Sequence, residues 1–222
     1  MATRRWSAAA ALVALSVLWV PALLAQAEQR ILYASALDQS GAPAENLGPA
    51  DFVVREDRTS REILTVVSAA DPMEVALLVD NSQAAEPLIR DLRAGVTAFI
   101  RTLGADATGA AHRVAVITIG ERPTINTDYT GVQGANRIFA QPNSGAYMLD
   151  GIIETTQGIR KREASRAVIV GITTANGPDL SNRFYQAVVE ALRTSGAALH
   201  IFVVGSPRGL DQERQLAFDM GT

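Results

Sequence analysis

The sequence has no cysteine and only two histidines among its 222 residues. Disulfide cross-links and cysteine-based metal sites are therefore excluded, and a zinc site of the usual kind is not expected. Basic and acidic residues nearly balance, 20 against 23, which leaves a net charge of −3. Proteins that bind nucleic acid through its phosphates need a basic face, so this balance argues against a nucleic-acid partner.

Sequence motifs for nucleotide binding and hydrolysis are also missing. The chain contains no G-x-G-x-x-G, G-x-x-x-x-G-K-S/T, G-x-S-x-G or H-E-x-x-H pattern. His112 precedes a predicted strand, and His200 lies within one among apolar residues, where we interpret it as a hydrogen-bonded core residue. Neither has a nucleophile at a recognisable spacing, so we do not expect an enzyme; an exported hydrolase with an unrecognised site is the alternative.

The N-terminus has the pattern of an export signal. Arg4 and Arg5 precede an apolar run from 8 to 20, and Ala25-Gln26-Ala27 has the small-x-small form of a cleavage site. The run is shorter than the about 20 apolar residues that span a membrane. Residues 1–27 are predicted to be a cleaved signal peptide of a periplasmic or secreted protein without a stable membrane span. An uncleaved membrane anchor is the alternative.

Residues 28–70 are predicted to form a small β preface. Apolar and β-branched segments alternate there with turn-forming residues. The predicted strands are Ile31–Leu37, Asp51–Glu56 and Ile63–Ser68, with turns at Asp38–Gly41 and Asp57–Ser60. A sheet of this size rarely stands alone, so we interpret it as an element that packs on the main domain, with a ligand module as the alternative.

Residues 73–222 alternate apolar runs with amphipathic helical stretches, a pattern typical of a parallel sheet with helices on both faces. Met73–Val79 is almost continuously apolar, as expected for a strand buried on both faces. The other predicted strands are 114–119, 123–130, 167–173 and 197–204, and the predicted helices are 88–103, 147–160, 183–193 and 210–220. This pattern predicts a doubly wound, mostly parallel α/β fold, in which ligands bind beyond the carboxyl ends of the strands.

The residues at these strand ends carry a family resemblance. The first strand ends in Asp80-Asn81-Ser82, and SGAYMLDGI at 144–152, IVGITTANG at 169–177 and IFVVG at 201–205 follow in order. Together they resemble a von Willebrand factor type A (vWA) domain. The preface resembles a segment that precedes this domain in a bacterial exported group of related proteins. The resemblance implies a Rossmann-like vWA fold with a binding function, and a chain that continues into one more strand and helix, so we expect a fragment.

The resemblance also implies a site for a magnesium-type ion, held by one Asp, two Ser, one Thr and a second Asp. Asp80 and Ser82 match the first two positions, whereas the other three fall on Ala84, Ala146 and Thr174. Mg²⁺ requires octahedral oxygen ligands, usually with carboxylates among them. Two of these side chains offer no oxygen, so we expect a degenerate site without metal or cofactor. Weak Mg²⁺ binding at Asp80 and Ser82 is the alternative.

Two interpretations of Asp80 and Ser82 stay open. Directly after a strand, they can cap the following helix, which stabilises it by about 1 kcal/mol. Alternatively, they form with Ala84, Ala146 and Thr174 the rim of a metal-free contact surface. The chain would then be an exported module for an unidentified protein or extracellular ligand, with a cation-dependent adhesion domain as the alternative. A receiver-type phosphotransfer domain is set aside because it needs clustered acids and a lysine at the strand ends.

Overall fold

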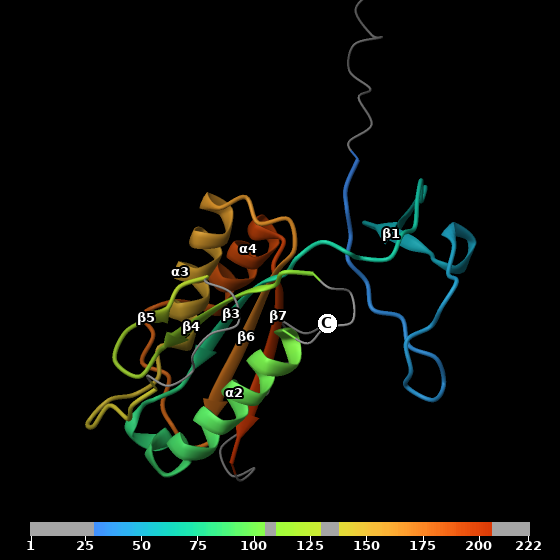
Figure 1. Cartoon of the computed structure of the whole chain (residues 1–222). Helices are drawn as coiled ribbons and strands as arrows, with labels where there is room; N and C mark the ends of the chain where they lie inside the picture. The colour runs from blue at the N-terminus through green and yellow to red at the C-terminus, as the bar shows by residue number, and fades with distance from the viewer. Residues whose placement is uncertain (1–28, 105–109, 130–137, 206–222) are drawn as a thin grey trace, which may run out of the picture. The chain divides into compact units, whose positions relative to one another are not determined.

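The computed structural model describes residues 29–104, 110–129 and 138–205 (Figure 1). The chain divides into two compact units, Met1–Thr65 and Val66–Thr222. The predicted signal peptide and the predicted helix at 210–220 lie outside the described residues. Within the described ranges, no helix is long and apolar enough to cross a membrane.

The first unit contains a two-stranded hairpin. β1 (Val54–Glu56) pairs antiparallel with β2 (Thr59–Arg61). Asp57 and Arg58 between them have positive φ angles of 48° and 66°, which suit the type I′ turn of a two-residue hairpin. The predicted turn at 57–60 is therefore shorter than expected, and the chain enters β2 at once.

The three-stranded sheet expected for the preface is wrong. Residues 31–36 and 63–68 form no strand, and Leu37 makes only an isolated bridge with Pro43. The short 3₁₀ helix η2 (Pro49–Asp51) lies farther along the chain. β-branched composition favours an extended backbone, but a strand also needs a pairing partner and a face to bury. Ile31 and Leu32 lack that burial, with 83% and 68% of their surface exposed.

The turn predicted at Asp38 is present. Asp38 Oδ1 accepts hydrogen bonds from the Ser40 hydroxyl (2.6 Å), the Ser40 N–H (2.8 Å) and the Ala42 N–H (3.0 Å). The Ser40 hydroxyl is the largest cause that lowers the pKa of Asp38 below its ordinary value. Gly41 completes the turn with a φ of 83°, a conformation that favours glycine.

The second unit is built on a five-stranded sheet of order β5-β4-β3-β6-β7. β4, β3, β6 and β7 run parallel, and the short β5 pairs antiparallel with β4. The strands are β3 (Glu74–Val79), β4 (Arg113–Thr118), β5 (Thr124–Thr127), β6 (Ala167–Thr174) and β7 (Ala198–Val204). This is the doubly wound, mostly parallel sheet that the sequence predicts.

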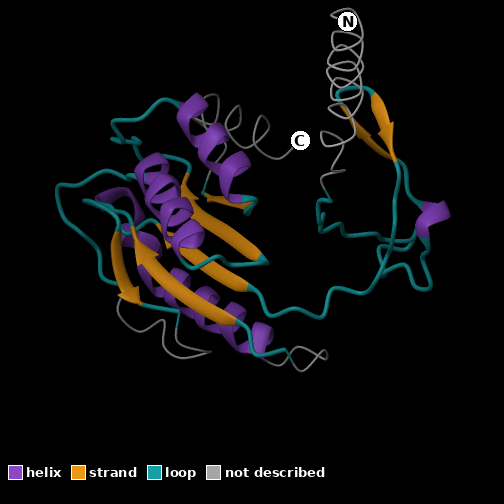
Figure 2. Ribbon diagram, turned by 90° about the horizontal axis from the view of Figure 1, so that it is seen from above, coloured by secondary structure: helices purple, strands orange, loops and turns teal. Residues whose placement is uncertain are grey.

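Helices cover both faces of this sheet (Figures 1 and 2). The 3₁₀ helix η3 (Gln83–Leu88) leads into α2 (Ile89–Gly104), which packs against one face. α3 (Met148–Lys161) and α4 (Tyr185–Ser195) pack against the other. Alternate β3 residues, such as Leu77 and Leu78, enter the two cores. Every residue of β3 is buried, as its apolar run predicts.

β7 is buried less than its apolar sequence predicts. Leu199 and Ile201 pack into the core beneath α3 and α4, whereas His200 and Phe202 on the opposite face are exposed. The interpretation of His200 as a core residue is therefore wrong. β7 lies at the edge of the described sheet, and an apolar edge strand has the same sequence pattern as a central one.

One charged residue lies in the core at the start of β3. Glu74 is only 4% exposed and forms ion pairs with Arg113 and Arg162, the latter at 3.0 Å. The Arg162 guanidinium also lies 3.8 Å from the centre of the Tyr129 ring. Arg162, the C-cap residue of α3, thus neutralises a buried carboxylate. Burial is the largest cause that raises the pKa of Tyr129 above its ordinary value, and the charge of Arg162 opposes it.

Candidate functional site

Asp80 lies at the carboxyl end of β3 and is completely buried. Its backbone N–H donates to the Ile172 carbonyl of β6 (2.8 Å), which fixes the residue between the two strands. Oδ1 accepts the Ser82 N–H at 2.8 Å. Oδ2 accepts the Thr174 hydroxyl (3.1 Å), the Thr174 N–H (3.3 Å) and the Thr173 hydroxyl (3.3 Å). Protein donors therefore surround both oxygens of this buried carboxylate, as a buried charge requires.

Ser82 is also completely buried, but its hydroxyl has no hydrogen-bond partner in the described structure. Although Ser82 is the N-cap residue of η3, its side chain makes no capping hydrogen bond. The Ser82 N–H donates to Asp80 Oδ1, which forms a local turn between β3 and η3. The described contacts therefore show neither the Asp80 nor the Ser82 side chain accepting an N–H group of η3, as the capping interpretation requires.

The other three candidate positions lie around these two residues. A Cβ placed on Gly177 would lie 3.0 Å from both Ala84 Cβ and Thr174 Oγ1, and 3.7 Å from Ser82 Oγ. The Ala146 N–H donates to the Pro178 carbonyl (3.0 Å), and the Ala146 carbonyl accepts the Leu180 N–H (2.7 Å). The structure thus brings all three loops together at the carboxyl end of the sheet, as the topology predicts.

The candidate residues lie beneath the surface of these loops. Asp80 and Ser82 are 0% exposed, Thr174 2% and Ala146 3%, and Ala84 is half-buried. The residues exposed above them come from the same loops: Gln83, Asn143, Asn176, Pro178, Asp179 and Leu180. Any partner at this end of the sheet meets the second set of side chains first.

Among these five candidate positions, the donor set for a metal ion is small. Asp80 supplies their only carboxylate, and both of its oxygens already accept hydrogen bonds. The Thr174 hydroxyl donates to Asp80, which leaves Ser82 Oγ as the one candidate oxygen without a partner. Ala84 and Ala146 contribute methyl groups. In the described ranges, no group of three or more His, Cys, Asp or Glu side chains is placed to hold a metal.

Asn81, which the sequence analysis did not single out, joins three segments beside Asp80. Its Oδ1 accepts the Gly120 N–H (2.7 Å), and its Nδ2 donates to the Phe139 carbonyl (2.7 Å). Its backbone carbonyl accepts the Gln141 N–H at 2.7 Å. A Cβ on Gly120 would lie 2.6 Å from Asn81 Oδ1, so only glycine permits this approach. Its position next to Asp80 is the one sequence signal for this role.

The loop between β6 and α4 is fastened to the first turn of α3. Asp150 accepts hydrogen bonds from the Arg183 side chain (3.0 Å) and the Asn182 N–H (3.2 Å), and its own N–H donates to Ser181 Oγ (3.2 Å). This anchored loop presents apolar side chains to solvent: Leu180 is 50% exposed and Phe184 83% exposed. The sequence analysis missed this surface, because its anchor is distant in sequence.

The two histidines belong to other parts of the second unit. His112 is buried just before β4, and its Nδ1 accepts the Met73 N–H at 2.9 Å. Met73 and His112 precede β3 and β4, so this contact lies at the amino end of the parallel strands, away from Asp80. His200 is exposed on β7. The structure therefore brings neither histidine to the candidate site.

The geometry defines a Rossmann-like α/β domain whose candidate site lies at the carboxyl ends of its parallel strands. No family model and no curated protein matches the chain. Among solved structures, the chain is similar to proximal thread matrix protein 1 from the mussel byssus, with a TM-score of 0.51 and 16% sequence identity. The match covers 64% of this chain and spans 38% of that protein. It shows the fold alone, which agrees with the vWA-like sheet expected from the sequence.

Proposed function

We propose that this chain is an exported vWA-like module that binds a protein partner without a bridging cation. The observation that carries the proposal is the environment of Asp80. Its two oxygens accept hydrogen bonds from Ser82, Thr173 and Thr174. A cation would have to displace these donors, with too few other oxygens at the candidate positions to replace its hydration shell.

The proposed contact surface is the loop that Asp150 anchors, with Leu180 and Phe184 as its exposed apolar residues. Exposed apolar side chains held on a fixed loop are typical of protein-binding surfaces, in which a few aromatic residues supply most of the affinity. Tyr185, 47% exposed, follows Phe184 at the start of α4. The neighbouring backbone is fastened to Ala146, so a partner would meet a surface whose shape is set before binding.

One observation favours the cation-dependent alternative. Ser82 Oγ is completely buried and unpartnered in the described structure, and a buried hydroxyl normally has a hydrogen-bond partner. An ion next to Asp80 and Ser82 would supply that partner, but a buried water would do the same with no change in charge. We prefer the metal-free function because an ion would find only one free ligand among the candidate positions, the neutral Ser82 hydroxyl. The Asp80 carboxylate beside it already accepts hydrogen bonds from the protein.

Affinity capture with the exported protein tests the proposal. The bait is used with Mg²⁺ or with a chelator, and bound proteins are identified by mass spectrometry. We expect the same partner under both conditions. Phe184→Ser should lose it, whereas Phe99→Ser on α2, 39% exposed, serves as the matched control and should retain it. Capture that needs Mg²⁺ and disappears in the Asp80→Ala variant would instead establish the cation-dependent function.

A further inference from the structure

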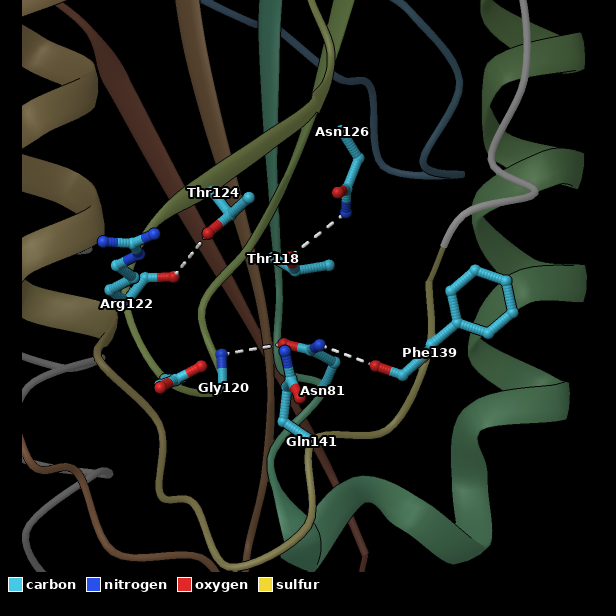
Figure 3. Close-up of a pocket in the computed structure, with 9 residues that line it drawn as sticks. Asn81, Thr118, Gly120, Arg122, Thr124, Asn126, Phe139 and Gln141 are labelled. Carbon is cyan, nitrogen blue, oxygen red and sulfur yellow. Dashed lines mark hydrogen bonds between the residues drawn. The ribbon is translucent and has the colours of Figure 1, made fainter.

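A second concave site lies beside the Asp80 loops, at the ends of β3 and β4 and along β5. It is a pocket of about 150 Å³ (Figure 3). It is lined by Asn81, Thr118, Gly120, Glu121, Arg122, Thr124, Asn126, Phe139 and Gln141. The five candidate positions at the Asp80 site are not among these residues. The pocket is therefore a separate feature of the same edge of the sheet.

Hydrogen bonds fix one side of the pocket. Asn81 is 4% exposed, and its side-chain amide is held by Gly120 and by Phe139, both at 2.7 Å. Asn126 Nδ2 donates to Thr118 Oγ1 at 3.1 Å. Figure 3 shows these contacts along the pocket, and they involve residues that follow or belong to β3, β4 and β5. Thr118, Thr124 and Asn126 belong to β4 and β5, and the hydrogen bonds of Asn81 and Asn126 tie the lining loops to these strands, which preserves the shape of the pocket for a ligand.

Two further polar side chains of the pocket have no partner among the described residues. Gln141 and Glu121 are exposed, and no hydrogen bond or ion pair joins their side chains to another described residue. Asn126 keeps its Oδ1 free in the described structure, because its hydrogen bond to Thr118 uses Nδ2. These groups offer both donors and acceptors, since an amide does both and a carboxylate accepts.

We infer that this pocket binds one pyranose unit of a neutral saccharide. A cavity of about 150 Å³ is large enough for a six-membered ring. None of the described lining residues has an aliphatic side chain, so an apolar ring would leave the amides and the carboxylate unsatisfied. Sugar hydroxyls donate and accept, as the amides of Gln141 and Asn126 do. Glu121 and Arg122 contribute opposite charges, which favours a neutral ligand over an anionic one.

Titration of the exported protein with methyl glycosides of glucose, galactose, mannose and N-acetylglucosamine, followed by NMR chemical shifts, tests this inference. We expect at least one to bind with a Kd on the order of 1 mM, typical of a single small polar ligand. Gln141→Ala should weaken binding about tenfold, the effect of one lost hydrogen bond. Gln157→Ala, an exposed residue of the same type on α3, is the matched control and should bind as the native protein does.

Glu121→Gln provides a second variant whose fold should be unaffected, because Glu121 is exposed and has no ion pair with a described residue. It should also weaken binding, whereas Glu154→Gln on α3 should not. No binding of any glycoside at tens of millimolar, or unchanged binding by both pocket variants, would refute the inference. Tighter binding of glucuronate or glucose 6-phosphate than of the neutral glycosides would also refute it, because the ligand would then be an anion.

The saccharide inference does not depend on the protein-binding function. Phe184→Ser should leave glycoside binding unchanged, because Phe184 does not line the pocket. Gln141→Ala should leave capture of the protein partner unchanged. A protein that captures a partner but binds no glycoside would therefore retain the proposed function and lose only this inference.

Discussion

Replacing Asp80 by alanine tests most directly whether protein hydrogen bonds, and no metal ion, satisfy the carboxylate of Asp80. The change removes the acceptor of four hydrogen bonds, donated by Ser82, Thr173 and Thr174. Each buried donor left without a partner costs about 1–3 kcal/mol. The hydroxyls can rotate and water can enter, so we expect less than the full sum, about 3–5 kcal/mol. For a chain of this size that corresponds to a decrease in Tm of about 6–20 °C.

Thermal unfolding followed by circular dichroism measures this loss, with Mg²⁺ and with a chelator. We expect Asp80→Ala to be destabilised equally under both conditions. Ser82→Ala is the matched control: its hydroxyl is equally buried but unpartnered, so its loss should change the free energy of unfolding by less than about 1 kcal/mol. An increase of several degrees in the Tm of the native protein with millimolar Mg²⁺, absent in both variants, would refute the conclusion that Asp80 binds no cation.

The reverse experiment installs the missing ligands with Ala84→Ser, Ala146→Thr and Thr174→Asp together. Thr174 Oγ1 lies 3.1 Å from Asp80 Oδ2, so an aspartate at 174 places two carboxylates side by side. Their repulsion should lower the Tm in chelator, and Mg²⁺ should raise it again by several degrees. If Mg²⁺ has no effect on the triple variant, loop geometry and not donor chemistry is what excludes the ion.

The remaining predictions concern packing and pH. Gly120→Ala should destabilise the fold by about 1–3 kcal/mol in urea unfolding, because its Cβ would lie 2.6 Å from Asn81 Oδ1. Gly95→Ala on α2 meets nothing within 4 Å and should stabilise by about 0.5–1 kcal/mol. The raised pKa of Tyr129 means that the folded state retains its proton longer, so stability should decrease as pH rises above about 10. Tyr129→Phe should abolish that component and change stability at pH 7 by less than about 1 kcal/mol, since the Tyr129 hydroxyl has no hydrogen-bond partner in the described structure.

The sequence predicted the main sheet well, because its central strands are continuous apolar runs. Every residue of β3 is buried, and each end of β3 and β4 lies within one residue of its predicted position. The edge strand β7 has an equally apolar sequence, yet His200 is exposed. Burial on one face or two depends on which strand lies alongside, and a single strand's sequence does not contain that information. The predicted three-stranded sheet at 28–70 was wrong for a related reason: a segment with high strand propensity still needs a neighbouring strand to pair with, and its own sequence does not supply one.

The approximate place of the candidate site follows from topology, but its contacts do not. Parallel strands bring their carboxyl ends to one edge, so loops at 80–84, 144–147 and 173–177 were expected to meet. The hydrogen bonds that decide what the site can do join residues far apart in the chain, such as Asn81 with Phe139. Asp150 likewise fastens a loop about thirty residues later. A local sequence pattern does not reveal hydrogen bonds between residues so far apart. The sequence therefore predicted which loops meet, but not the hydrogen bonds that hold them together.

The burial of Asp80 has a consequence for how recognition at this edge would evolve and be altered. With Asp80, Ser82, Thr174 and Ala146 at most 3% exposed, substitutions there act on folding before they act on binding. Side chains on the anchored loop, such as Phe184, have few internal contacts to lose and can change with little effect on stability. Binding specificity should therefore vary with the loop while the polar site beneath it stays constant. Variants of Phe184 that alter partner capture at an unchanged Tm would show that separation directly.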